Sequence, residues 1–90
     1  MKVLFTKDVW TDYLLWQETD RKIARRINEL IQDIRRTPFR GIGKPEPLRN
    51  DLQGWWARRI GSEHRLVYRL TGSADERRVE VLACRYHYAR

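Results

Sequence analysis

The sequence has 90 residues, which suffices for one small domain over residues 1–90 and leaves no room for a second. Apolar residues make up 41% and charged residues 34%, a balance typical of a folded globular chain and not of a disordered one. The single cysteine, Cys84, excludes an intramolecular disulfide, and the apolar runs are too short for a membrane-spanning helix. Because the N-terminus also lacks the pattern of a signal peptide, we expect a cytoplasmic protein without a membrane partner.

The chain is strongly basic, with 19 Lys and Arg against 12 Asp and Glu and an isoelectric point near 10.2. The excess is uneven, since residues 1–19 carry a net charge of −1 and residues 20–90 a net charge of +8. Such an excess on a small domain indicates a polyanionic partner such as nucleic acid, or an acidic protein. The charge alone leaves both open, together with a protein that is basic only for solubility.

The first part of the chain predicts one strand and two helices. Lys2–Phe5 is a short strand candidate. Asp8 is expected to cap a helix from Val9 to about Gln17, and Asp20 to cap a longer one. Pro38 should end this second helix, because the residue before a proline avoids helical backbone. Its apolar residues recur on one face, at Ile23, Ile27, Leu30, Ile31 and Ile34.

The second part predicts a long loop and three consecutive strands. Glycines and prolines punctuate residues 37–54, and irregular segments of this length in small domains are often functional. Strands are expected over Trp55–Ile60, His64–Leu70 and Val79 to about Tyr88, with a turn at 61–63 and a loop at 71–77. The expected fold is α+β, with two N-terminal helices on one face of a mainly antiparallel sheet. The other face would stay open, as a groove for a polyanion.

Two segments offer charged side chains for chemistry. Pro45 and Pro47 restrict the backbone on both sides of Glu46, and rigid placement suits a general base. Alternation along residues 64–70 places Arg65 and Arg69 on one face of their strand, where planar guanidinium groups would suit a phosphate. Taken singly, a loop glutamate without a role and solvated surface arginines are the more common outcomes.

The C-terminal residues include aromatic groups and a second titratable candidate. His87 is one of two histidines and can act as a general acid near neutral pH. Tyr88 could stack on a base, as aromatic side chains do in single-strand binders. Tyr86 is instead expected to close the core.

The sequence predicts neither a metal site nor a cofactor. Cys84 and the two histidines show none of the usual ligand spacings, and phosphate-binding, dinucleotide-binding and nucleophile-elbow motifs are absent from the sequence. RNA permits cleavage without a metal, because its own 2′-hydroxyl can attack the adjacent phosphate. The reaction needs a base, a cation and an acid, and Glu46, Arg65 and His87 could supply them in that order.

Seven segments are also familiar as an ordered set over nearly the whole chain. They are Trp16–Asp20, Ile27–Ile31, Arg35–Phe39, Gly43–Leu48, Trp56–Ile60, Glu63–Tyr68 and Arg85–Tyr88. In this order they resemble the YoeB (Txe) family of the RelE toxin superfamily, whose fold is RelE-like or microbial-RNase-like. The resemblance implies the toxin of a type II toxin–antitoxin pair. Such toxins enter the ribosomal A site and cleave mRNA there as metal-independent endoribonucleases, which inhibits translation.

The resemblance also implies residue roles and partners. Glu46 matches the family's proposed base, His87 its proposed acid, Arg65 its phosphate-stabilising arginine and Tyr88 the tyrosine that orders the site. The positions expected to touch RNA are Arg59, Arg49 and Lys44. The implied partners are mRNA and ribosomal RNA, and a YefM-type antitoxin whose C-terminal segment covers the groove. A homodimer or a toxin–antitoxin hetero-oligomer is expected.

Three alternatives remain open on the sequence. One is a non-catalytic basic protein that binds the ribosome or RNA and inhibits translation. Another is an interaction module neutralised by an acidic protein. Within the enzyme hypothesis, nearby arginines would favour the ionised form of Glu46 and so weaken it as a base. Glu46 could therefore mainly orient the 2′-hydroxyl or Arg65.

Overall fold

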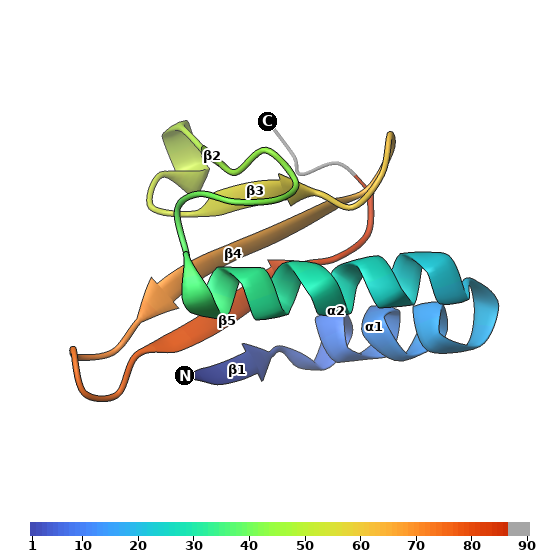
Figure 1. Cartoon of the computed structure of the whole chain (residues 1–90), viewed down its shortest axis with the longest axis horizontal. Helices are drawn as coiled ribbons and strands as arrows, with labels where there is room; N and C mark the ends of the chain where they lie inside the picture. Colours follow the sequence, from blue (N-terminus) through green and yellow to red (C-terminus); the bar gives the residue numbers. More distant parts are fainter. Residues whose placement is uncertain (87–90) are drawn as a thin grey trace.

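The structure, a computed structural model, describes residues 1–86, so the predictions for His87 and Tyr88 lie outside the described residues. Two helices, α1 (Lys7–Thr19) and α2 (Arg21–Arg36), pack against one face of a five-stranded sheet, as Figure 1 shows. The strands are β1 (Lys2–Phe5), β2 (Glu46–Pro47), β3 (Trp56–Arg59), β4 (Arg65–Thr71) and β5 (Arg78–Ala83), and a short 3₁₀ helix, η1, spans Asn50–Leu52. This confirms the predicted α+β class.

The sheet has the strand order β1-β5-β4-β3-β2. Strands β3, β4 and β5 form the predicted antiparallel meander, and β1 pairs with β5 in parallel. Strand β2 was not predicted, because it contains only two residues and the chain is irregular on both sides of it. It extends the sheet by pairing antiparallel with β3. The sheet is therefore mixed but mainly antiparallel, as expected.

The helix boundaries follow from capping side chains. Asp20 caps α2 as predicted, because its carboxylate accepts from the backbone N–H groups of Lys22 and Ile23. The prediction that Asp8 caps α1 was wrong. Thr6 does so, with its hydroxyl accepting from Val9 N at 3.4 Å, and Asp8 lies in the first turn. A carboxylate there still stabilises the helix by interacting with its dipole.

The main core lies between α2 and the sheet. Ile27, Leu30 and Ile34 of the predicted apolar face are completely buried. From the sheet they meet the buried side chains of Leu66, Tyr68, Val79 and Val81. Full burial of one such aliphatic side chain stabilises a fold by about 1.5–3 kcal/mol. The contact between α2 and this face of the sheet therefore contributes strongly to the stability of the fold.

The other face of the sheet is less open than expected. Leu48, Leu52 and Trp55, from the segment that contains η1, pack over Ala57 and Val67 in a second, smaller cluster. This covers part of the face, because the apolar residues of the loop need partners of their own. On the rest of this face, Glu46 of β2 and Arg59 of β3 are exposed.

The C-terminal strand is shorter than predicted. Strand β5 ends at Ala83, and the chain then bends. Tyr86 has a positive φ of 60° and is 54% exposed, so the prediction that it closes the core was wrong. Among residues 1–86, no helix combines the length and apolar character needed to cross a bilayer.

Candidate active site

The candidate site is the free face of the sheet at strands β2, β3 and β4. The register pairs Glu46 with Ala57 and Arg59 with Arg65. Directly opposed residues in antiparallel strands share a face, and Ala57 and Arg59 share one because they are two residues apart. Glu46, Arg59 and Arg65 therefore lie on the same face, away from the helices. Glu46 and Arg65 lie on the two strands that flank β3, about 10 Å apart across the sheet and offset by two residues along it.

The Arg65 guanidinium is oriented by the turn that precedes its strand. Its Nη1 donates to the carbonyl oxygens of Gly61 at 2.9 Å and His64 at 3.0 Å. Within residues 1–86, its Nε and Nη2 make no hydrogen bond. A half-buried guanidinium that is fixed at one nitrogen, with donors to spare, is suited to bind an anion in a defined orientation.

Glu46 is exposed on this face, between its two prolines. The sequence suggested that arginines would surround it, yet no cation in the described part of the chain lies within ion-pair distance of its carboxylate. Arg59 is exposed on the same face at the end of β3. Lys44 and Arg49 are also exposed but belong to the loops on either side of β2, so no strand register assigns their side chains to this face.

Arg58 has a structural role that the sequence did not reveal. It is completely buried on the helix-facing side of β3. Its guanidinium donates to Asp33 Oδ2 at 2.6 Å and to the Tyr68 hydroxyl at 3.1 Å. Three backbone carbonyls accept the remaining bonds, those of Thr37 at 2.6 Å, Arg40 at 2.9 Å and Ile42 at 3.1 Å. All five N–H groups of the guanidinium are thus used.

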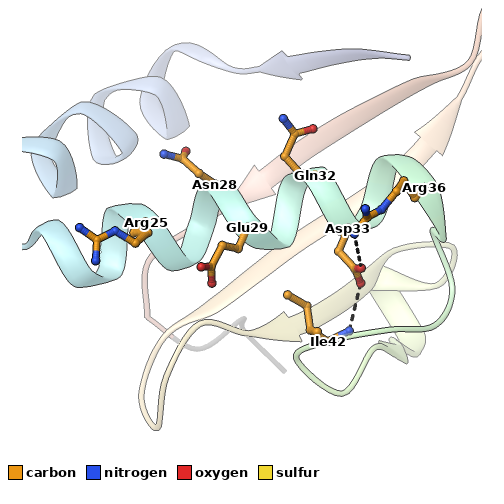
Figure 2. A pocket seen from close by; sticks show the side chains of 7 residues that line it. All are labelled: Arg25, Asn28, Glu29, Gln32, Asp33, Arg36 and Ile42. Atoms are coloured by element: carbon orange, nitrogen blue, oxygen red, sulfur yellow. Dashed lines mark hydrogen bonds and ion pairs between the residues drawn. The ribbon is translucent and has the colours of Figure 1, made fainter.

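This buried arginine anchors the loop that leads to Glu46. Figure 2 shows Asp33 reaching from α2 to the loop, where its Oδ2 also accepts from Ile42 N at 3.0 Å. The hydrogen bond from Arg58 is the main cause that lowers the pKa of Asp33, and the Ile42 N–H adds to it against the opposing effect of burial. The loop is therefore fixed to α2 and β3 by a charged side chain from each.

Two glycines let the loop approach this anchor closely. Gly41 and Gly43 have φ values of 123° and 82°, in the region that favours glycine. A Cβ at Gly41 would lie 2.0 Å from Asp33 Oδ2, and one at Gly43 would lie 2.8 Å from Leu30 Cδ2. The backbone N–H of Arg59 then donates to the Gly43 carbonyl at 2.7 Å and starts the pairing that places Glu46.

The last described residue of the chain, Tyr86, lies next to Arg65. The backbone N–H of Arg65 donates to the Tyr86 carbonyl at 3.1 Å, and the Tyr86 N–H donates to His64 Nδ1 at 2.7 Å. The last described residue is thus hydrogen-bonded to the backbone of the candidate phosphate-binding arginine. His87 is the next residue in the sequence.

Other chemistry has less support from these side chains. Over the described range, no three His, Cys, Asp or Glu residues gather as a metal-binding group. Cys84 is fully buried, and burial raises the pKa of its thiol to about 12. A thiol with such a pKa is not a nucleophile at neutral pH. The exposed carboxylate and guanidinium groups are the reactive groups that the site offers.

This fold, with a cationic free sheet face, defines the class of RelE-type bacterial toxins. The family model described as "YoeB-like toxin of bacterial type II toxin-antitoxin system" matches residues 5–88. Toxin YoeB of Escherichia coli (strain K12) is 56% identical over 88 residues, which is 98% of this chain and 100% of that protein. The chain therefore belongs to the YoeB-like toxin family.

Solved structures agree with this assignment. The YoeB/ParE toxin from Agrobacterium tumefaciens has a TM-score of 0.95 and 53% identity, covering 98% of this chain and 100% of that one. A heterotetrameric YoeB–YefM toxin–antitoxin complex from Staphylococcus aureus contains a chain with a TM-score of 0.85 and 38% identity, covering 98% of both chains. The family resemblance seen in the sequence is thus confirmed at the level of the whole fold.

Proposed function

We propose that this protein is a ribosome-dependent mRNA endoribonuclease that cuts in the ribosomal A site without a metal ion and so inhibits translation. The observation that carries the proposal is the register that puts Glu46 and Arg65 on one free face, across β3 from each other. Membership of the YoeB-like toxin family supports it. The basic excess of the chain provides attraction for RNA.

The proposed reaction uses the RNA's own nucleophile. Glu46 takes the proton from a 2′-hydroxyl, and the resulting oxygen attacks the adjacent phosphorus. Arg65 stabilises the negative charge on the phosphoryl oxygens, for which preorganised donors are effective. The bond to the 5′-oxygen breaks, and His87 gives that oxygen a proton. The products are a 2′,3′-cyclic phosphate and a 5′-hydroxyl.

The surroundings of Glu46 support its role as the base. No salt bridge within the described residues occupies its carboxylate oxygens, so they stay available for a 2′-hydroxyl. Pro45 and Pro47 limit how far the backbone of Glu46 can move. Geometry decides the efficiency of a general base before its pKa does. We therefore prefer the base assignment to a purely orienting role.

The remaining predicted residues would bind RNA around this centre. Arg59 shares the free face with Glu46 and Arg65, and Arg59 is exposed. Lys44 and Arg49 flank β2 and can reach a strand of RNA that passes over it. Tyr88 would also contact the RNA. The RNA partners would be the message and the surrounding ribosomal RNA.

The protein partner would be a YefM-type antitoxin. The Staphylococcus aureus relative is described in a heterotetrameric complex with YefM, and another structure from that organism is described as a YoeB dimer. An antitoxin segment laid over the free sheet face would cover Glu46 and Arg65 together and block RNA. The toxin would act in the cytoplasm, where it meets ribosomes.

A message with one 2′-deoxynucleotide at the scissile position tests the proposed chemistry. Ribosomes programmed with the all-ribose message should yield new mRNA ends carrying a 2′,3′-cyclic phosphate, and the deoxy message should stay intact because it lacks the nucleophile. Cleavage of the deoxy message at the same rate would overturn the mechanism. Translation arrest without new ends would overturn the nuclease and favour the non-catalytic ribosome binder.

A further inference from the structure

The segment after β5 is fastened to the fold at each of its described residues. Trp16 Nε1 donates to the Cys84 carbonyl at 3.0 Å, and Arg85 Nη1 lies 3.4 Å from Asp12 Oδ1. Tyr86 is bonded through both its backbone N–H and its carbonyl. The described residues therefore end at a well-defined position, one residue before His87.

His64 lies at the centre of this attachment. Its side chain is 14% exposed, and its ring meets the ring of Trp16 edge-on at 4.9 Å between centroids. Its Nδ1 accepts the Tyr86 N–H at 2.7 Å. The ring nitrogen Nδ1 acts as the acceptor in this hydrogen bond. The Nε2 atom is 3.9 Å from the Glu63 carboxylate.

The backbone of Tyr86 needs this attachment. Its φ of 60° is in the left-handed region, which a tyrosine rarely adopts. Residues in such conformations persist only where the surrounding structure holds them. Here His64 Nδ1 holds the N–H and the Arg65 N–H holds the carbonyl, so two adjacent residues of one turn determine the conformation.

We infer that His64 is a positioning residue for His87, an inference that rests on the proposed function. By accepting the Tyr86 N–H, His64 holds the residue that precedes the proposed acid in the sequence. Arg65 binds the same residue and, in the proposed reaction, also binds the phosphate. His64 and Arg65 thus both hold Tyr86, the residue before the proposed acid, and His64 would act without touching RNA or the reacting atoms.

Two variants separate the acceptor from the ring. In His64→Asn, the side-chain oxygen can accept the Tyr86 N–H from nearly the position of Nδ1. His64→Leu keeps a similar volume and has no acceptor. Thermal melting and ribosome-binding affinity should be measured for both variants, and the Tyr86 amide followed by NMR.

The rate measurement uses two messages on the ribosome. One has the ordinary linkage, and the other has sulfur in place of the leaving 5′-oxygen. A thiolate leaves without a proton, so this substrate does not need an acid. His64→Leu should cut the ordinary linkage about 10–100-fold more slowly, since small displacements of a reacting group cost rates of this size. It should cut the sulfur linkage at the wild-type rate, and His64→Asn should stay within about threefold of wild type on both.

Three results would overturn the inference. They are wild-type cleavage of the ordinary linkage by His64→Leu, equal slowing on both linkages, and no rescue in His64→Asn. A double variant, His64→Leu with His87→Ala, should be no slower than His87→Ala alone. If His87→Ala itself cuts at the wild-type rate, the proposed acid is wrong and the proposed function fails. If His87→Ala is slow while His64→Leu is normal, only the role of His64 fails.

Discussion

Two adjacent arginines, Arg58 and Arg59, have different roles because they point to opposite faces of β3. Alternation along a strand is enough to separate two adjacent residues onto opposite faces. Alternation does not reveal the five acceptors around Arg58, because four of them belong to α2 and to the loop after it. The sequence pattern of a strand can predict that an arginine is buried only when the groups that accept its hydrogen bonds are known.

Replacing Arg58 should destabilise the protein much more than replacing its neighbour. Arg58→Met leaves Asp33 and three carbonyl groups without their donor in a mostly buried place, which should cost about 3–5 kcal/mol of unfolding free energy. Arg59→Met changes an exposed side chain and should stay within about 0.5 kcal/mol. Urea unfolding followed by tryptophan fluorescence measures both. Equal effects of the two variants would contradict the anchoring role of Arg58.

The ion pair of Asp33 should make stability depend on pH in the acid range. Its folded-state pKa is lowered, mainly by the hydrogen bond from Arg58, below the ordinary value of 3.8. The stabilisation is therefore fully present above about pH 5 and is lost as the pH falls through the folded-state pKa.

The free-energy difference between wild type and Asp33→Asn should accordingly shrink as the pH is lowered below about 4. Asp75→Asn, in the loop after β4, provides a control because this exposed carboxylate makes no ion pair within residues 1–86. Urea unfolding at a series of pH values gives both curves. A wild-type advantage over Asp33→Asn that persists undiminished below pH 3 would show that the ion pair contributes nothing.

At the scale of elements, the sequence was most informative where a pattern repeats. The apolar face of α2, from Ile23 to Ile34, spans about three turns. The limits of the helix are marked by Asp20 and Pro38, so both its existence and its buried face were predictable. Strand β2 has two residues and depends wholly on pairing with β3, and pairing is a tertiary property. The cap of α1 was missed because Thr6 and Asp8 are both capping residue types, and only the backbone distinguishes them.

An added methyl group should have different effects at two glycines, Gly43 in the loop from α2 to β2 and Gly54 between η1 and β3. Gly43 and Gly54 both have positive φ, so alanine is strained at each. A Cβ at Gly54 meets nothing within 4 Å, whereas one at Gly43 meets Leu30 and lies 3.1 Å from Arg58 Cβ. Gly43→Ala should therefore cost about 1–3 kcal/mol more than Gly54→Ala.

Because residues 43–47 place Glu46, Gly43→Ala should also slow mRNA cleavage, and Gly54→Ala should slow it less. Chemical unfolding and cleavage assays on the same preparations measure the two effects. If Gly54→Ala proves the more damaging of the pair, the close contact between the loop and Arg58 is not what fixes Glu46.

At the scale of the whole molecule, the charge predicts a polyanionic partner, and the sheet register offers a face for it. The basic excess pointed to a polyanion without saying which surface it meets. The sheet register then puts Arg59 and Arg65 on the face that the helices leave free. The candidate site was predictable as a set of residues, Glu46 and Arg65 above all. Their common face was not, because it depends on β2.

Binding to ribosomes should weaken steeply as salt rises. Each phosphate contacted by a Lys or Arg contributes about −0.7 to −0.9 to the slope of log affinity against log salt. Arg59→Ala should make this slope shallower by about that amount, and Arg77→Ala, in the loop between β4 and β5, should leave it unchanged. The slopes are measured by equilibrium binding to ribosomes at several salt concentrations, with both substitutions made in the inactive Glu46→Gln protein so that the message is not cut. An unchanged slope in Arg59→Ala would remove that residue from the RNA-binding surface.

The central claim is that the exposed carboxylate on the free sheet face performs RNA cleavage. It is tested most directly by primer extension on translating ribosomes with wild type, Glu46→Gln, and Glu76→Gln as a control on a distant turn. The account predicts new mRNA ends at the A site with wild type and Glu76→Gln, and a rate at least about 100-fold lower with Glu46→Gln at equal ribosome occupancy. Wild-type cleavage by Glu46→Gln would contradict it.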